Sequence, residues 1–107
     1  MTDDVGPIFS ALSDPSRRHL VQALARQDSA SLSELAADLP VTRQAVSKHL
    51  AALGEAGLVD ATRSGRETRY RLTPGPLGGA VAWMERVGGE WETRLDALRS
   101  HLATREE

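Results

Sequence analysis

The sequence lacks cysteine, holds a single lysine and has no long apolar run. Without cysteine the chain can form no disulfide, no thiolate metal site and no thiol redox switch. No segment approaches the roughly 20 apolar residues that a membrane span requires, and residues 1–9 lack the apolar core of a secretion signal. These absences lead us to expect a soluble cytoplasmic protein that neither crosses a membrane nor uses thiol chemistry.

The charges are few and unevenly placed. Thirteen Lys and Arg against 15 Asp and Glu give a net charge of −2, which argues against a protein that is basic everywhere. Residues 41–71 nevertheless carry six basic and three acidic side chains, so this segment is +3 and the remainder is −5. A positive segment on a negative chain would aim one face at a polyanion. The length of 107 residues suits one domain, and we expect residues 1–107 to form it.

Capping signals place two helices before residue 41. Asp14 has the position of an N-cap with proline at the first helical residue, and the apolar spacing predicts a helix to about residue 27. Ser31 and Glu34 have capping-box spacing, which predicts the start of a short helix that Pro40 ends.

A third helix follows after a tight turn. Thr42 is its predicted N-cap, and Val41 and Val46 occupy the two positions of a hydrophobic staple. Gly57 has the place of a left-handed residue just after the helix. We therefore expect a helix-turn-helix over residues 31–56.

The chain then changes to a period of two. Residues 58–63 and 67–73 alternate as strands do, and a turn around Ser64-Gly65-Arg66 would join them. The sequence predicts a β-hairpin wing over residues 58–73 that leans on the helices, because two strands alone are marginal. The candidate phosphate or minor-groove contacts of this wing are basic: Arg63, Arg66 and Arg69.

The third helix has two unlike faces on a helical wheel. The small and polar arc consists of Arg43, Gln44, Ser47, Lys48 and Ala51. An ordinary amphipathic helix with a solvated face would show the same pattern. The order of short helix, tight turn, polar-faced helix and basic hairpin instead favours a winged helix-turn-helix whose third helix enters a DNA major groove.

The candidate DNA-binding residues of this helix stand on or beside its polar arc: Thr42, Arg43, Gln44, Ser47, Lys48 and His49. Arginine and glutamine can bind guanine and adenine edges, and short side chains let the helix backbone approach the bases. The wheel places His49 on the buried arc, so we expect packing as its first role and a phosphate hydrogen bond as the alternative.

The last predicted helix, residues 77–102, carries a heptad seam. Apolar residues and one glycine recur at alternating spacings of four and three: Leu77, Val81, Met84, Gly88, Trp91, Leu95, Leu98 and Leu102. We expect this seam to form a dimer interface, joined by Ile8, Phe9 and Leu12 of an N-terminal helix over residues 7–13. Packing on its own domain is the alternative. The pair Gly88-Gly89 either kinks the helix or lets two backbones come close.

Four stretches resemble the ArsR/SmtB repressors in family order: ALSDPSRRHLVQAL, SELAADL, VTRQAVSKHLAALGEAGLV and GRETRYRL. The likeness covers about Phe9 to Leu72 and includes the S-x-H-L of the family's recognition helix. It implies a mainly α winged helix-turn-helix fold with a β-hairpin wing and a long C-terminal dimerisation helix. It also implies a homodimeric repressor that binds a short inverted repeat in double-stranded DNA upstream of its own operon and releases it when an effector binds.

The sequence departs from the metal-sensing members of that family. Alanines stand in residues 34–39, where those members carry cysteines, and Asp96 and His101 are five residues apart without a second histidine. A zinc site needs about four ligands, so we expect no metal and no cofactor. A small apolar molecule at the dimer interface, a partner protein or no effector at all remain open as the source of control.

Two other functions are weighed against DNA binding. A winged helix can serve as a protein-protein interaction module without DNA readout, but the basic hairpin tip and the small polar arc argue against it. An enzyme has little support, because the three histidines fall in separate elements and no nucleophile and base pair or phosphate loop is visible.

Overall fold

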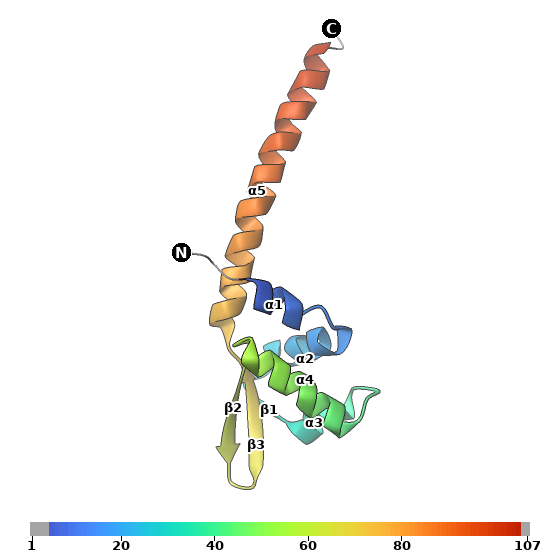
Figure 1. Cartoon of the computed structure of the whole chain (residues 1–107), viewed down its shortest axis with the longest axis vertical. Helices are drawn as coiled ribbons and strands as arrows, with labels where there is room; N and C mark the ends of the chain where they lie inside the picture. The colour runs from blue at the N-terminus through green and yellow to red at the C-terminus, as the bar shows by residue number, and fades with distance from the viewer. Residues whose placement is uncertain (1–4, 106–107) are drawn as a thin grey trace.

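A computed structural model describes residues 5–105, as a small helical body with one long projecting helix (Figure 1). In chain order the elements are α1 (Gly6–Ala11), α2 (Pro15–Ala25), β1 (Ala30–Ser31), α3 (Leu32–Ala37), α4 (Arg43–Glu55), β2 (Val59–Ser64), β3 (Glu67–Leu72) and α5 (Pro74–Arg105). The principal extents are 71 × 34 × 21 Å. The expected fold class, mainly α with a hairpin wing and a long C-terminal helix, is confirmed.

The helix starts follow the predicted caps. The carboxylate of Asp14 accepts hydrogen bonds from the backbone amides of Ser16 and Arg17 at 2.8 and 3.2 Å. At the start of α3, the Ser31 hydroxyl accepts from the amide of Glu34 at 3.1 Å, and the Glu34 carboxylate accepts from the amide of Ser31 at 2.8 Å. Both helices therefore begin where side chains satisfy amides that have no intrahelical partner.

Hydrogen bonds between residues close in sequence determine where helix α4 begins and ends. The Thr42 hydroxyl oxygen accepts from the amide of Ala45 at 3.1 Å. After the last turn, Gly57 has a φ of 78°, and the amide of Leu58 donates to the carbonyl of Leu53 at 2.9 Å. This is a Schellman ending, which uses a left-handed glycine to close the helix and turn the chain into β2.

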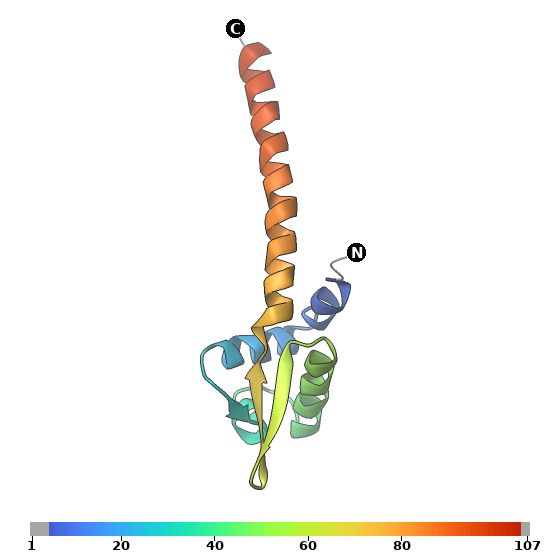
Figure 2. The same ribbon diagram turned by 90° about the vertical axis from the view of Figure 1, so that its left-hand side faces the viewer.

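The sheet has three strands in the order β1-β3-β2, all antiparallel, rather than the two expected from sequence. The added strand β1 pairs Ala30 with Tyr70 and Ser31 with Arg69. It joins the wing to the segment that leads directly into α3 (Figure 2). The hairpin therefore does more than lean on the helices, because a backbone ladder attaches it to the helix-turn-helix.

The core lies where α1, α2, α3, α4 and the first residues of β2 and α5 meet. Its buried hydrophobic side chains are Ile8, Ala11, Leu20, Val21, Leu24, Ala30, Leu35, Val46, Leu50, Leu53, Leu58, Val59 and Ala80. Packing of these side chains holds α4 with one face inward and the other face outward. Across residues 5–105, no helix combines the length and hydrophobicity needed to cross a membrane.

Helix α5 is longer than predicted. It begins at Pro74 rather than at Leu77, because prolines are tolerated in a first helical turn, whose amides need no intrahelical partner. It then continues through Gly88 and Gly89 as one helix, and neither view shows a kink at its middle (Figures 1 and 2). Of the two alternatives for Gly88-Gly89, the structure shows no kink, and close approach of two backbones stays a prediction.

Candidate nucleic-acid interface

The outer side of α4 is a polar face on a rigid support. Its members are all exposed: Arg43, Gln44, Ser47, Lys48 and Ala51. On the opposite side, Val46, Leu50 and Leu53 are buried in the core. The wheel-based division of this helix is confirmed, and the buried side chains fix its rotation about its own axis. We call these five exposed residues the polar face of α4.

The hairpin ends in a two-residue turn formed by Gly65 and Arg66, because Ser64 pairs with Glu67. Gly65 has a φ of 64° and Arg66 does not have a positive φ, which is the pattern of a type II′ turn with glycine at its first central position. Arg63 donates from Nε to the carbonyl of Gly65 at 3.2 Å, so its side chain folds over the turn. Arg66 is exposed at the tip.

One cleft joins the first turn of α4 to the hairpin. Arg43 and Arg66 line the same cleft, although 23 positions separate them along the chain. The other lining residues come from α3 and its N-cap and from β3: Ser31, Leu32, Ser33, Glu67, Thr68 and Tyr70. The fold thus brings one predicted helix residue and one predicted wing residue to the two sides of a single concave surface.

A second groove separates the middle of α4 from the hairpin. Ser47, Ala51 and Gly54 line its helix side, and Ala61 and Tyr70 line its sheet side. Because these residues of α4 are small, a DNA duplex can approach the helix backbone closely here. Arg43 of the polar face of α4 lines the cleft, and Ser47 and Ala51 of the same face line the groove.

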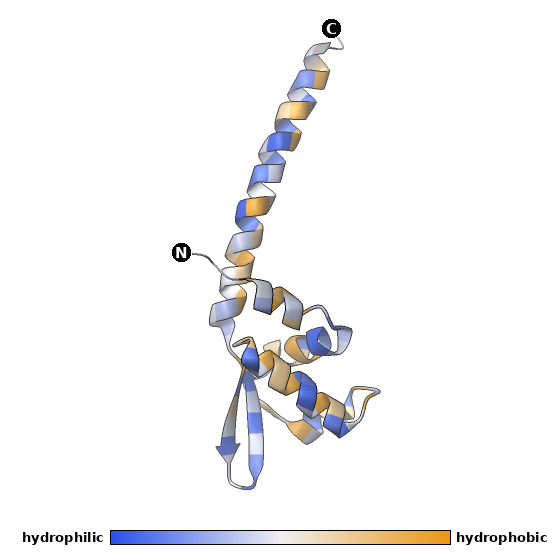
Figure 3. Cartoon of the chain, viewed as in Figure 1, coloured by the Kyte–Doolittle hydropathy of each residue, from blue (hydrophilic) through white to orange (hydrophobic). Residues whose placement is uncertain are grey.

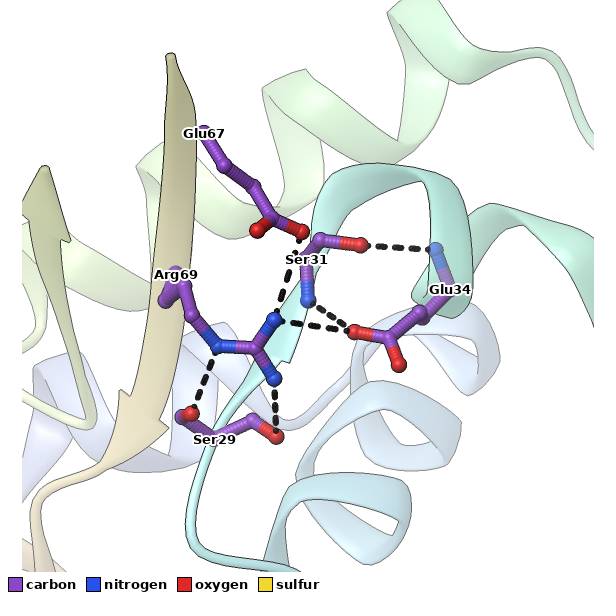
Figure 4. Close-up of polar contacts among 5 residues, drawn as sticks. All are labelled: Ser29, Ser31, Glu34, Glu67 and Arg69. Atoms are coloured by element: carbon purple, nitrogen blue, oxygen red, sulfur yellow. Dashed lines mark hydrogen bonds and ion pairs between the residues drawn. The ribbon is translucent and has the colours of Figure 1, made fainter. Parts of the chain in front are cut away.

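Arg69 is placed differently from the other predicted wing residues (Figure 4). Its Nε donates to the Ser29 hydroxyl at 2.8 Å and its Nη2 donates to the Ser29 carbonyl at 3.1 Å. Its Nη1 lies 3.3 Å from a Glu34 oxygen and 3.2 Å from a Glu67 oxygen. The guanidinium therefore points into the joint between β3 and the start of α3.

Two carboxyls near the interface belong to helix caps. Hydrogen bonds from the Ser31 backbone and side chain, together with the nearby charge of Arg69, hold the pKa of Glu34 below its usual 4.5. Partial burial raises the pKa of Asp14, but the amides of Arg17 and Ser16 and the charge of His49 bring it below its usual 3.8. His49 is half-buried and close to the cap of α2, and its packing role stays a prediction.

The comparisons with known proteins agree with this geometry. Residues 12–61 match the model of a helix-turn-helix domain. The HTH-type transcriptional regulator YuzN of Bacillus subtilis is 39% identical over 92 residues, which cover 79% of this chain and 100% of YuzN. An ArsR-like transcriptional regulator from Rhodococcus sp. RHA1 has a TM-score of 0.75 at 43% identity and covers 90% of both chains. This chain belongs to the ArsR family.

A third comparison comes from Mycobacterium bovis. The homodimeric winged helix-turn-helix DNA-binding domain of a possible ArsR-family regulator there has a TM-score of 0.65 at 26% identity, covering 82% of this chain and 81% of that domain. As a member of the ArsR family, the present chain is a transcriptional regulator that binds DNA through its winged helix-turn-helix.

The near end of α5 is fastened to the body of this ArsR-family chain. The ring of Phe9 meets that of Trp83 edge to face at a centroid distance of 5.5 Å, and Leu12 and Leu77 pack partly buried against the core. Ile8 was expected at a dimer interface, and this expectation needs correction. It is only 5% exposed, because it belongs to the core of its own chain.

The far part of α5, which we define as residues 84–105, stands away from the body. Large apolar side chains along α5, 37% to 57% exposed, are Val81, Met84, Trp91, Leu95, Leu98 and Leu102. Apolar bands recur along this helix to its end, with polar residues between them (Figure 3). The predicted seam is therefore a real exposed stripe from Val81 onward, and its first residue, Leu77, packs on the body.

Within the described residues, no group of three or more Asp, Glu or His side chains lies where it could hold a metal ion.

Some residues near the interface were not predicted from the sequence. Ser29, Thr68 and Tyr70 were not expected near the interface, although Ser29 binds Arg69 and the other two line the cleft. The short strand β1, which directly follows Ser29, has too few residues for any periodic signal.

Proposed function

We propose that this ArsR-family chain is a homodimeric repressor that reads an inverted-repeat operator with α4 and steadies the complex with its hairpin. The observation that carries this proposal is the shared cleft of Arg43 and Arg66 beside an exposed polar face. A helix beside a basic hairpin tip has the shape that enters a major groove while the tip reaches the flanking backbone. Occupying DNA upstream of its own operon would then block transcription.

The residues of α4 take distinct roles in this proposal. Arg43 and Gln44 stand in the first turn, where they can form paired hydrogen bonds with guanine and adenine edges. Ser47 and Lys48 follow one turn later, toward a second base and the phosphate backbone. Thr42 uses its oxygen as the helix cap, which leaves its hydroxyl proton for a phosphate.

The hairpin is proposed to make contacts that do not depend on the base sequence. Arg66 at the tip is exposed, and Arg63 lies beside it, so both are suited to phosphate or minor-groove binding. His49 is held near the cap of α2 and is proposed to pack rather than to read DNA.

The dimer is proposed to form through the exposed stripe of α5. Fully burying a leucine-sized side chain stabilises an assembly by about 1.5 to 3 kcal/mol, and six such side chains of α5 are exposed in the single chain. Phe9, Leu12 and Leu77, half-buried beside the stripe, are proposed to complete the interface. The relative from Mycobacterium bovis is homodimeric, which supports a homodimer for this chain. Two copies would present two α4 helices to half-sites about 34 Å apart or a multiple of that distance.

The experiment that tests the proposal is a gel-shift titration with duplex DNA from upstream of the protein's own gene, at 50 and 200 mM salt. A dimer with 6 to 10 phosphate contacts should lose about 10³- to 10⁵-fold in affinity across that range, because bound counterions are released. A protein-protein interaction module would show no duplex binding, and its apolar contact would respond little to salt. That outcome would refute the proposal.

We also propose that the chain acts by binding rather than by catalysis, since its relatives are transcriptional regulators. The same titration, repeated with and without zinc, tests the expectation that no metal controls binding. Unchanged affinity would leave a small apolar molecule, a partner protein or no effector as the source of control. Release of DNA by zinc would contradict that expectation.

A further inference from the structure

Arg69 differs from Arg63 and Arg66 in what it touches. We propose that Arg69 is a positioning residue, which sets the angle between the hairpin and the helix-turn-helix and does not itself bind phosphate. The proposal rests on the DNA-binding role of α4 and the hairpin given above, and it assigns to Arg69 a task that its charge and its place in the wing do not suggest.

The contacts of Arg69 cross between segments far apart in sequence. Its bonds to the hydroxyl and carbonyl of Ser29 span 40 positions. The contact with Glu34 adds the first turn of α3, and the backbone pairing of Ser31 with Arg69 adds β1 (Figure 4). One planar guanidinium thus holds the hairpin strand, the preceding loop and the start of the helix-turn-helix in one arrangement.

Charge balance at this site disfavours a phosphate contact. Two carboxylates, those of Glu34 and Glu67, lie within 3.3 Å of Nη1 of Arg69. The Arg69 side chain is 31% exposed, and its Nε and Nη2 are already used on Ser29. A phosphate would have to displace these partners, whereas Arg66 stands exposed at the tip.

The same contacts link the hairpin to α4. Glu34 accepts from the amide of Ser31 in the capping box and also faces Arg69 through the same oxygen, Oε1. Helix α3 packs on α4, so a shift of the hairpin relative to the capping box changes the distance between Arg66 and the polar face of α4. If only a fraction of molecules hold the productive angle, the apparent affinity for DNA falls to that fraction of its full value.

The test compares two conservative substitutions, Arg69→Lys and Arg66→Lys. Lysine keeps the positive charge but cannot reach Ser29 and Glu34 together with a planar fork. Arg69→Lys should weaken operator binding about tenfold, as expected if a tenth of the molecules keep the angle. Arg66→Lys should stay within about twofold, because a point charge still binds phosphate. Near-wild-type affinity for Arg69→Lys would overturn the proposal.

Folding and wing order are measured alongside affinity. Binding is measured at a temperature where circular dichroism shows both variants fully folded, so a loss of stability alone would leave affinity unchanged. Faster amide hydrogen exchange in β1 and β3 of Arg69→Lys, with Arg66→Lys unaltered, is the expected sign of a loosened hairpin. If amide exchange in β1 and β3 of Arg69→Lys is as slow as in the wild type, the positioning role of Arg69 is contradicted.

A second pair of variants tests the proposal if Arg69→Lys fails to fold. Glu34→Gln and Glu67→Gln each remove one negative charge beside Arg69, and glutamine still serves in a capping box. The positioning role of Arg69 predicts that Glu34→Gln binds DNA more weakly than Glu67→Gln, because only Glu34 connects the hairpin to α3. Tighter binding by both variants would mean that freed Arg69 contacts phosphate.

The proposed function fails separately from this inference. If wild-type protein shows no salt-dependent duplex binding, the DNA face itself is wrong. If wild type binds and Arg66→Ala lowers the salt slope by about 0.9 while Arg69→Lys changes neither affinity nor exchange, only the role of Arg69 is wrong.

Discussion

The polar face of α4 and the far part of α5 are both exposed helical surfaces, yet their chemistry is opposite. On α4 the outward residues are polar or small, above an apolar side that is buried in the body. On the far part of α5 the exposed stripe is apolar, with Trp91 and Leu95 at its middle. A wet, charged partner such as DNA suits the first surface, and an identical apolar helix suits the second.

The two surfaces also lie at opposite ends of the molecule. The hairpin tip and the C-terminal end of α5 mark the two extremes of the longest axis (Figure 1). If the dimer forms through the stripe of α5 and the polar face of α4 reads DNA, as proposed, the two properties depend on different residues. Substitutions in one region should then change one property before the other.

The largest effect is expected from Leu95→Asp on the stripe of α5. An unpaired carboxylate in an apolar interface carries a desolvation cost of several kcal/mol, so the dimer should dissociate and operator binding should vanish at low concentration. Sedimentation velocity measures the assembly. Ala97→Asp, on the opposite side of α5, is the matched control and should leave a dimer. A dimer that survives Leu95→Asp would refute the stripe as the interface.

The next effect is expected from Arg43→Ala on the polar face of α4. Loss of a paired base contact should cost about 1 to 3 kcal/mol at the operator and relax the preference at one base pair, with the dimer intact. Competition gel shifts with single-base operator variants measure both quantities. Arg99→Ala, far along α5, serves as the control and should bind normally. Unchanged operator affinity for Arg43→Ala would mean that α4 does not read the groove.

A smaller effect is expected from the two glycines of α5. Alanine at Gly88 or Gly89 should stabilise the helix by about 0.5 to 1 kcal/mol, and a Cβ at either position meets nothing within 4 Å in the single chain. Gly88 lies on the stripe and Gly89 beside it. If two backbones approach at the stripe, Gly88→Ala weakens the dimer and Gly89→Ala does not. Equal dimer dissociation constants for the two variants would exclude close approach there.

The smallest effect is expected from acid. Glu34 and Asp14 have pKa values below their usual 4.5 and 3.8 in the folded chain, so their contribution to stability is present at neutral pH and is lost as pH falls below about 4.5. Thermal unfolding followed from pH 7 to pH 3 should show this loss. Glu34→Gln should lose less than wild type, whereas Glu92→Gln on the far part of α5 should match wild type. The same acid loss in Glu34→Gln as in wild type would contradict this role.

The parts of the fold that depend on neighbouring residues were predictable from the sequence. The caps at Asp14, Ser31 and Thr42 use side chains within three positions of their targets, and all three are confirmed. The inward and outward sides of α4 follow from helical period alone. The left-handed glycine after α4 is likewise a local requirement, because Gly57 ends the helix by a positive φ.

The parts that depend on distant residues were not predictable. Strand β1 has two residues, so its assignment comes from pairing with β3 and not from any period. Arg69 was predicted to contact DNA with the other basic residues of the wing, but its side chain is hydrogen-bonded to Ser29, which lies 40 positions away. Ile8 was expected at the dimer interface with Phe9 and Leu12. Only the folded structure shows that it is buried in the core of its own chain.

The most direct test of the central claim is an amide chemical-shift titration of the labelled dimer with duplex DNA from upstream of its gene. The predicted result is that the large shifts cluster in residues 42–51 and 63–68, while residues 91–105 stay unchanged. Shifts concentrated along the far part of α5, with the polar face of α4 silent, would contradict the assignment of the two surfaces.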